Sequence, residues 1–269
     1  MWAWRGSAAA ECGSAVAVIN PAQSANYSKS LPRRPKTDPH DSLLLRQFAQ
    51  ERQPPKGCPT WTPPPDVYHE LRQRLVARDA LMEMRQQARN QHHALSQWPV
   101  HVAPVLTQFT AVIAEFDTRI AELDRAIAPV LTDGAWAASA ALLASIPGLG
   151  TTTSAWLRVA TLNVALCPTP ESAAAYAGLA PMAHESGTSV RGGSHLGRGG
   201  HQRLRKTLYM ATLSAARYNP VIRPFFQRLR LKGKPFKVAY CAAARKLVTL
   251  AWAVVTKARP FDPQHRVGA

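Results

Sequence analysis

Ser186 lies in a segment whose residue types could cut a phosphodiester. The segment His184–Lys206, HESGTSVRGGSHLGRGGHQRLRK, is rich in glycine and basic side chains and has no acidic residue after Glu185. A serine hydroxyl becomes a nucleophile when a base, a metal or nearby positive charge activates it. Charge that develops on a phosphodiester is stabilised by cationic donors such as Arg191 and Arg198. We therefore expect a flexible loop that becomes ordered when it binds a polyanion. A serine in a loop often has no role beyond forming the turn.

A hydrolase interpretation of the same serine is less favoured. Serine hydrolases place the nucleophile in a Gly-x-Ser-x-Gly elbow between a strand and a helix. That pattern is absent around Ser186. Attack on phosphorus suits a serine that is followed by glycine and several arginines.

A second pair of residues that could do chemistry lies nearer the N-terminus. In TDPHDSLLLRQFAQ, Asp38 fits a helix N-cap, Pro39 the first helical position and Asp41 the third. This spacing puts both carboxylates near one face of a helix, where they could hold Mg²⁺ for phosphoryl transfer. A plain helix N-cap box has the same spacing.

Positive charge is concentrated in the last third of the chain. Residues 186–260 contain sixteen Lys or Arg and no Asp or Glu, whereas residues 1–185 hold sixteen basic and fifteen acidic groups. The net charge of the 269 residues is +17. A field of one sign binds anions, most often phosphate backbones, and a surface kept basic for solubility normally mixes both signs. We therefore predict a nucleic-acid partner.

The segment His201–Tyr218 is predicted to be a helix with one apolar face. That face consists of Leu204, Leu208, Ala211 and Ala215. Basic residues in its first turns oppose the helix dipole, which makes more sense if they face a phosphate. The predicted contacts to DNA or RNA are Arg191, Arg198, Arg203, Arg205 and Lys206.

A tight glycine turn lies between two predicted helices in ALLASIPGLGTTTSAWLRVAT, Ala141–Thr161. The segment Pro147–Gly150 is similar to the turn of helix-hairpin-helix DNA binders. In such turns Gly148 and Gly150 would let backbone N–H groups approach a phosphate. An ordinary helical turn has the same composition.

The remaining pattern predicts the scaffold. The run AVAVIN, Ala15–Asn20, favours a buried strand. The proline-rich segment Arg52–Asp66 is typical of a linker. Two long helices follow at about Val67–Gln97 and Pro104–Leu131, and a last helix begins after Pro235. Apolar residues at spacings of three and four predict a paired seam: Leu71, Leu75, Leu81, Met82, Phe109, Val112, Phe116, Ile120, Leu123 and Ile127.

Cysteine spacing and hydropathy exclude some classes of protein. Cys12, Cys58, Cys167 and Cys241 form no metal-ligand pattern, which is typical of a reduced cytoplasmic protein. No segment resembles a signal peptide. The apolar segment Val238–Val255 carries Arg245 and Lys246 at its centre, so we expect no membrane partner.

Three ordered motifs resemble the insertion-sequence 110/1111 family of transposases. They are INPAQSANYSKSLPRRPKTDPHDSLLLRQFA, AGLAPMAHESGTSVRGGSHLGRGGHQRLRKTLYMATLSAARYNP and GKPFKVAYCAAARKLVTLAWAVV. The resemblance covers about Ala15–Asp262. It implies a RuvC-like, RNase H-type α/β domain with four acids that bind Mg²⁺, a coiled coil, and a mainly helical domain with a catalytic serine. It further implies a covalent phosphoserine intermediate, a multimer and a guide RNA from the element.

Carried over by motif, Ser186 is the nucleophile, and Asp38 and Asp41 are the closing acid pair of the metal site. The predicted fold is mixed and mostly α. Residues 1–64 form a truncated RuvC-like domain with its linker, residues 65–134 the coiled-coil helices, and residues 135–262 the C-terminal transposase domain. We expect a dimer or tetramer paired through the coiled coil, located with the bacterial nucleoid in the cytoplasm.

The family pattern places an Asp strand and a Glu strand before INPAQ, and only about a dozen residues precede Ala15 here. We therefore expect an incomplete Mg²⁺ site. Two alternatives to an active recombinase remain open: an inactive remnant that only binds nucleic acid, and a basic RNA-binding protein of ribosomal type. The ribosomal alternative does not explain the paired acids or the helical seam.

Overall fold

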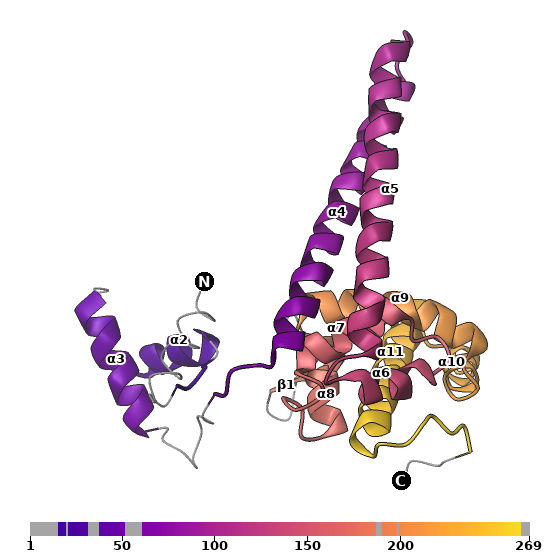
Figure 1. Cartoon of the computed structure of the whole chain (residues 1–269). Helices are drawn as coiled ribbons and strands as arrows, with labels where there is room; N and C mark the ends of the chain where they lie inside the picture. The colour runs from indigo at the N-terminus through magenta and orange to yellow at the C-terminus, as the bar shows by residue number, and fades with distance from the viewer. Residues whose placement is uncertain are drawn as a thin grey trace. The chain divides into compact units, whose positions relative to one another are not determined.

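A computed structural model describes residues 16–19, 21–31, 38–51, 61–186, 190–197 and 199–264. The chain divides into two compact units, residues 1–65 and 66–269. Apart from one two-stranded sheet, the regular elements of the described residues are helices (Figure 1). The predicted mostly-α class is therefore confirmed.

The first unit contains the helices α2 (Pro21–Ser30) and α3 (Asp38–Glu51). They meet through the rings of Tyr27 and Phe48, whose centroids lie 5.2 Å apart in an edge arrangement. The Tyr27 hydroxyl also donates a hydrogen bond of 2.8 Å to Glu51 Oε1. The predicted helix start at Asp38 is confirmed.

The strand predicted for Ala15–Asn20 is wrong for the residues that the structure describes there. Residues 16–19 contain a single bridge residue, Ala17, and Val18 is 45% exposed. One backbone hydrogen bond, from Trp61 N–H to Val16 O at 2.6 Å, holds this segment. A short apolar run forms a buried strand only where further strands cover it, and the described residues of this unit include no strand. The RuvC-like character of this unit stays a prediction.

The second unit begins with two long helices, α4 (Asp66–Ser96) and α5 (Ala103–Thr132), as the sequence predicts. They lie side by side and extend away from a helical body (Figure 1). Close to the body, Leu71 and Leu75 of α4 are fully buried in one cluster with Ile127 and Leu131 of α5. This apolar cluster anchors the pair.

Farther from the body, ion pairs join α4 and α5. Arg78 Nε lies 2.5 Å from Asp124 Oδ1, and Arg89 Nη2 lies 3.4 Å from Asp117 Oδ2. Arg85 also pairs with Asp117. Val112, predicted for the seam, is 44% exposed, because two helices alone bury only a narrow stripe of each other.

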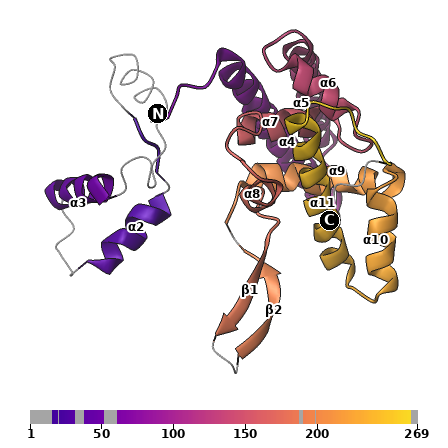
Figure 2. The ribbon, with the colours of Figure 1, turned by 90° about the horizontal axis from the view of Figure 1, so that it is seen from below.

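The body is built around one central helix. Its elements are α6 (Ala137–Ala144), α7 (Thr151–Thr161), α8 (Pro170–Tyr176), β1 (Pro181–Ser186), β2 (Val190–Leu196), α9 (Gln202–Tyr218), α10 (Ile222–Leu231) and α11 (Phe236–Thr256). Helix α11 packs on α6, α8, α9 and α10 (Figure 2). The predicted apolar face of α9 is confirmed, since Leu204, Leu208, Ala211 and Ala215 are all buried in this core.

Length and hydropathy alone would let α11 cross a membrane, and α5 with α6 would pass the same test as one segment bent by 110°. Within the body, however, α11 buries Ala243, Leu247 and Ala251 completely against its neighbours. Its burial is that of the core helix of a folded domain.

Candidate nucleic-acid interface

The segment around Ser186, predicted to be a loop, is a β-hairpin. Strands β1 and β2 pair in antiparallel register, with Ser186 opposite Val190 and Glu185 opposite Arg191. We call β1 and β2 the serine hairpin; it extends beyond the helices of the body (Figure 2). Ser186 is its last β1 residue before the turn. Cross-strand backbone hydrogen bonds hold such a hairpin whatever its side chains, and a short glycine-containing connection was the signal that could have found it.

Several predicted site groups lie outside the part of the chain that the structure describes. They are the side chains of Asp38, Ser186 and Arg191, and the whole of Arg198. For Ser186 and Arg191 the backbone register therefore gives the position, and for Asp38 the first turn of α3 does.

The two legs of the serine hairpin are held together where they leave the body. Gly178, before β1, and Gly200, after β2, both adopt positive φ, +69° and +89°. A Cβ built on Gly200 would lie only 2.5 Å from the Gly178 nitrogen, so the two backbones touch. The His201 N–H also donates to Tyr176 O at 2.7 Å. We call this contact the hairpin root.

Arg205 reinforces the hairpin root. Its Nε donates to Ala177 O at 3.3 Å and its Nη2 donates to Gly199 O, which joins the two legs through one guanidinium. A Cβ on Gly178 would lie 2.5 Å from Gly199 O, and Gly178 has a positive φ, so the main chain favours glycine there. Predicted as a phosphate contact, Arg205 directs these donors at main-chain carbonyls instead.

His201 caps the N-terminus of α9. Its Nδ1 accepts a hydrogen bond of 3.1 Å from Leu204 N–H, and its ring stacks near Tyr176, with 6.2 Å between centroids. Burial, together with the nearby Arg203 charge, lowers the pKa of this imidazole below its ordinary value. Since Nδ1 is the acceptor, the proton of the neutral ring sits on Nε2.

Arg203 connects α9 with the long helix α4. Its Nη1 lies 3.8 Å from Asp79 Oδ2, and its guanidinium carbon lies 5.5 Å from the Trp156 ring centroid. Burial raises the pKa of Asp79 above its ordinary value, and the Arg203 charge opposes that shift. Helices α9, α7 and α4 therefore meet around the Arg203 guanidinium.

Exposed cations are numerous on α9, α10 and α11 and on the segments that follow α10 and α11. The exposed ones among the described residues of this region are Arg203, Lys206, Arg217, Arg223, Arg228, Arg230, Lys232, Lys234, Lys237, Lys257 and Arg259. Residues 186–260 have no acid of their own to pair with them. Exposed Tyr209, Tyr218 and Phe236 lie among them, a combination suited to phosphates and bases.

The glycine turn between α6 and α7 forms as predicted, but its two glycines differ. Gly148 has φ +94°, and a Cβ there would lie 2.6 Å from Ala215 Cα, so Gly148 lets the turn pack on α9. Gly150 is exposed, caps α7, and has nothing within 4 Å of its Cβ position. Only Gly150 is thus free to approach a ligand.

The described residues contain no group of three or more His, Cys, Asp or Glu that could hold a metal. Asp38 and Asp41 lie in the first turn of α3, and Asp41 is exposed. Two carboxylates supply oxygen ligands that suit Mg²⁺, and further ligands would have to join them.

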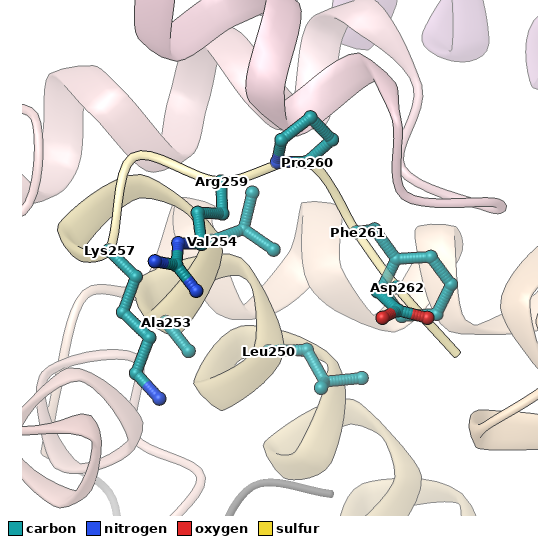
Figure 3. A pocket seen from close by; sticks show the side chains of 8 residues that line it. All are labelled: Leu250, Ala253, Val254, Lys257, Arg259, Pro260, Phe261 and Asp262. Atoms are coloured by element: carbon teal, nitrogen blue, oxygen red, sulfur yellow. The ribbon is translucent and has the colours of Figure 1, made fainter. Parts of the chain in front are cut away.

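Two cavities in the described part of the body differ from a substrate site that would hold Ser186. One of about 140 Å³ lies at the end of α11, between Leu250, Val254 and Phe261 with Lys257 and Arg259 at its rim (Figure 3). That volume is below the roughly 300 Å³ at which small-molecule sites begin. A wider groove of about 530 Å³ lies between α5, α6 and α7, and alanines dominate its lining. Neither brings nucleophile and cations together.

The chain is similar to two families of transposases and to several known proteins. Residues 1–97 match a DEDD-type IS110 family described as transposase, and residues 140–227 match the transposase family IS116/IS110/IS902. The pilin gene-inverting proteins of Moraxella bovis and Moraxella lacunata are each 33% identical over 250 residues, 92% of this chain and 74% of theirs. The uncharacterized 43.6 kDa protein of insertion element IS110 of Streptomyces coelicolor is 33% identical over 127 residues, 47% of this chain and 31% of that protein.

The chain belongs to the IS110/IS116/IS902 family of transposases. The resemblance predicted from its motifs is confirmed, and so is DNA as the substrate class. A transposase acts on DNA, and the acid-free surface of α9, α10 and α11 has the charge that would suit a phosphate backbone. Lys206 faces solvent there, whereas Arg203 and Arg205 make internal contacts.

Proposed function

We propose that this transposase cuts and rejoins DNA through Ser186. The Ser186 oxygen attacks a phosphodiester phosphorus, a serine–phosphate ester forms, and the bond to the leaving sugar oxygen breaks. The hydroxyl proton passes to a base and the leaving oxygen takes up a proton, so no external energy source is needed. Attack by a new strand end reverses these steps and rejoins the DNA.

The observation that carries this proposal is the placement of Ser186 in the fold. Ser186 ends β1 at the turn of the serine hairpin, and the root of that hairpin is fixed by Gly178, Gly200 and Arg205. A nucleophile must be held in a defined geometry to react efficiently. A hairpin with a fixed root, next to an acid-free cationic surface, supports that role.

Asp38 and Asp41 would hold Mg²⁺ in this scheme. Bound there, the cation would neutralise charge on the phosphate that is being transferred. The aspartates themselves would orient the ion from the first turn of α3. Further oxygen ligands would have to complete the coordination of the ion.

Assembly into a multimer and RNA guidance belong to the same proposal. On α5, Phe109 and Phe116 are only half-buried against α4, while Val105 and Val112 are exposed. A second copy of the pair would cover this apolar surface. The cationic surface of α9 to α11 offers enough phosphate contacts for a structured RNA as well as DNA.

A second candidate is a transposase remnant that binds nucleic acid but cuts nothing. The lack of a metal-binding group among the described residues favours it. Such a chain would keep strongly salt-dependent binding and lose covalent chemistry.

One experiment separates the two candidates. The full chain is incubated with Mg²⁺, element-end DNA and element RNA, and denatured samples are examined for protein–DNA adducts. We expect an adduct with wild type and with the control Ser194→Ala on β2, and none with Ser186→Ala. An adduct that survives Ser186→Ala would refute the serine assignment, and binding without any adduct would identify the remnant.

A further inference from the structure

Leu231 is the most exposed large apolar side chain among the described residues, with 89% of its surface open to solvent. It is the last residue of α10, and Lys232, Gly233 and Lys234 lead from it towards α11. The turn between these two helices lies at their free end (Figure 2). A single exposed leucine is common on protein surfaces, so a role for Leu231 has to be inferred from the residues around it.

The turn that carries Leu231 is rigid. Arg230 Nη1 donates to Lys234 O at 2.6 Å, and its guanidinium lies 5.9 Å from the Phe236 ring centroid. Phe236 stacks on Tyr240 with 5.4 Å between centroids, and the Tyr240 hydroxyl donates to Tyr209 O at 2.5 Å. Ring contacts and hydrogen bonds thus tie the turn down to α9, so Leu231 has a fixed position.

Every ionisable side chain near Leu231 in the sequence is a cation. The exposed ones are Arg228, Arg230, Lys232, Lys234 and Lys237. An apolar pocket on a protein would have to desolvate these charges or supply acids for all of them. A nucleic acid supplies one phosphate per nucleotide on either side of an apolar base step.

We propose that Leu231 is a wedge that inserts between adjacent base pairs of duplex DNA, while Lys232 and Lys234 bind the flanking phosphates. This inference rests on the proposed function for its DNA substrate. Apolar wedges of this kind partly unstack a step and kink the duplex, and the bent DNA then contacts more protein surface. Recombination requires the two strands of the duplex to separate, and a kink at the exchange site favours that separation.

The test uses the full chain and a duplex of about 30 base pairs, which is nearly straight because the persistence length is about 150 base pairs. A dye pair on its ends reports bending, and a second duplex with a central two-base mismatch offers a step that is already unstacked. We expect wild type to bend the matched duplex and to bind the mismatched one roughly tenfold more tightly. Leu231→Ala should lose both effects and keep the salt dependence of binding, and Leu231→Phe should restore them.

Leu213→Ala is the matched control, because Leu213 is an exposed leucine that belongs to α9 and not to the turn between α10 and α11. It should bend DNA as wild type does. Equal bending and equal mismatch preference in Leu231→Ala would overturn the wedge, as would a change in subunit number with no DNA present. No binding to either duplex, with all variants folded, would instead refute the DNA-binding function on which the wedge rests.

Discussion

Gly178 and Gly200 are in backbone contact across the root of the serine hairpin. A Cβ on Gly200 would lie 2.5 Å from Gly178 N and 2.6 Å from its Cα, and both residues have positive φ. No L side chain fits such a contact without moving the main chain. The contact fixes the separation of the two strands at one end and so limits where Ser186 can lie at the other.

Replacing Gly200 should therefore uncouple Ser186 from the body. In Gly200→Ala the root must open, with a loss of about 1–3 kcal/mol in the free energy of unfolding and at least a tenfold loss of adduct formation. Gly199→Ala is the matched control, because nothing lies within 4 Å of its Cβ position. Thermal unfolding and the adduct assay measure both effects. Full activity in Gly200→Ala would show that the root does not position the serine.

Arg205 and Lys206 are neighbours that should behave differently. Arg205 bonds to two main-chain carbonyls, so Arg205→Gln should cost about 1–3 kcal/mol of stability and leave the salt dependence of DNA binding nearly unchanged. Lys206 is exposed, so Lys206→Gln should keep stability and lower the slope of log K against log salt by about one. Titrations of DNA binding at several salt concentrations measure both slopes. A reduced slope for Arg205→Gln would show that Arg205 contacts a phosphate.

The glycine turn offers a second matched pair. Gly148→Ala should destabilise the body by about 2 kcal/mol or more, because its Cβ would meet Ala215 and its φ is +94°. Gly150→Ala should cost well under about 1 kcal/mol, since its surroundings are open. Denaturant unfolding measures both. A DNA affinity that falls in Gly150→Ala, with stability kept, would support a phosphate contact at this turn.

Lowering the pH should destabilise the N-terminal turn of α9, because His201 becomes protonated. Because its folded pKa lies below the ordinary 6.5, its contribution to stability is complete above pH 6.5 and is lost as the pH falls through 6.5 towards the folded value. Protonation removes the Nδ1 acceptor for Leu204 N–H. His201→Asn keeps a capping acceptor and does not titrate, so its melting temperature should fall less than that of wild type between about pH 7.5 and pH 5.5.

Exposed His93 gives a matched substitution, His93→Asn, which leaves the contact of His201 Nδ1 with Leu204 N–H in place. Asp79, whose pKa is raised mainly by burial, acts in the opposite direction at lower pH. The difference between variants therefore isolates His201. Identical pH profiles for wild type and His201→Asn would contradict the assignment.

Periodicity and composition determined the helices of this transposase. The pairing of α4 with α5 and the buried face of α9 are visible as apolar residues at spacings of three and four, and the turn before α7 is visible from its Pro and Gly residues. The family was also predictable, because its three motifs are long and ordered. These features depend on neighbouring residues in the chain, and sequence carries that information directly.

Only the tertiary structure revealed the serine hairpin, the hydrogen bonds of Arg205 to main-chain carbonyls and the packing of Gly148 on α9. A segment rich in glycine, serine and arginine has no apolar alternation, so its pairing into β1 and β2 leaves little mark in the sequence. For AVAVIN the sequence predicts a strand that the described residues do not form, since they include only one bridge residue. Arg205 and Gly148 met partners 28 and 67 residues away in Ala177 and Ala215. Contacts at that separation depend on how helices pack, and no local pattern encodes packing.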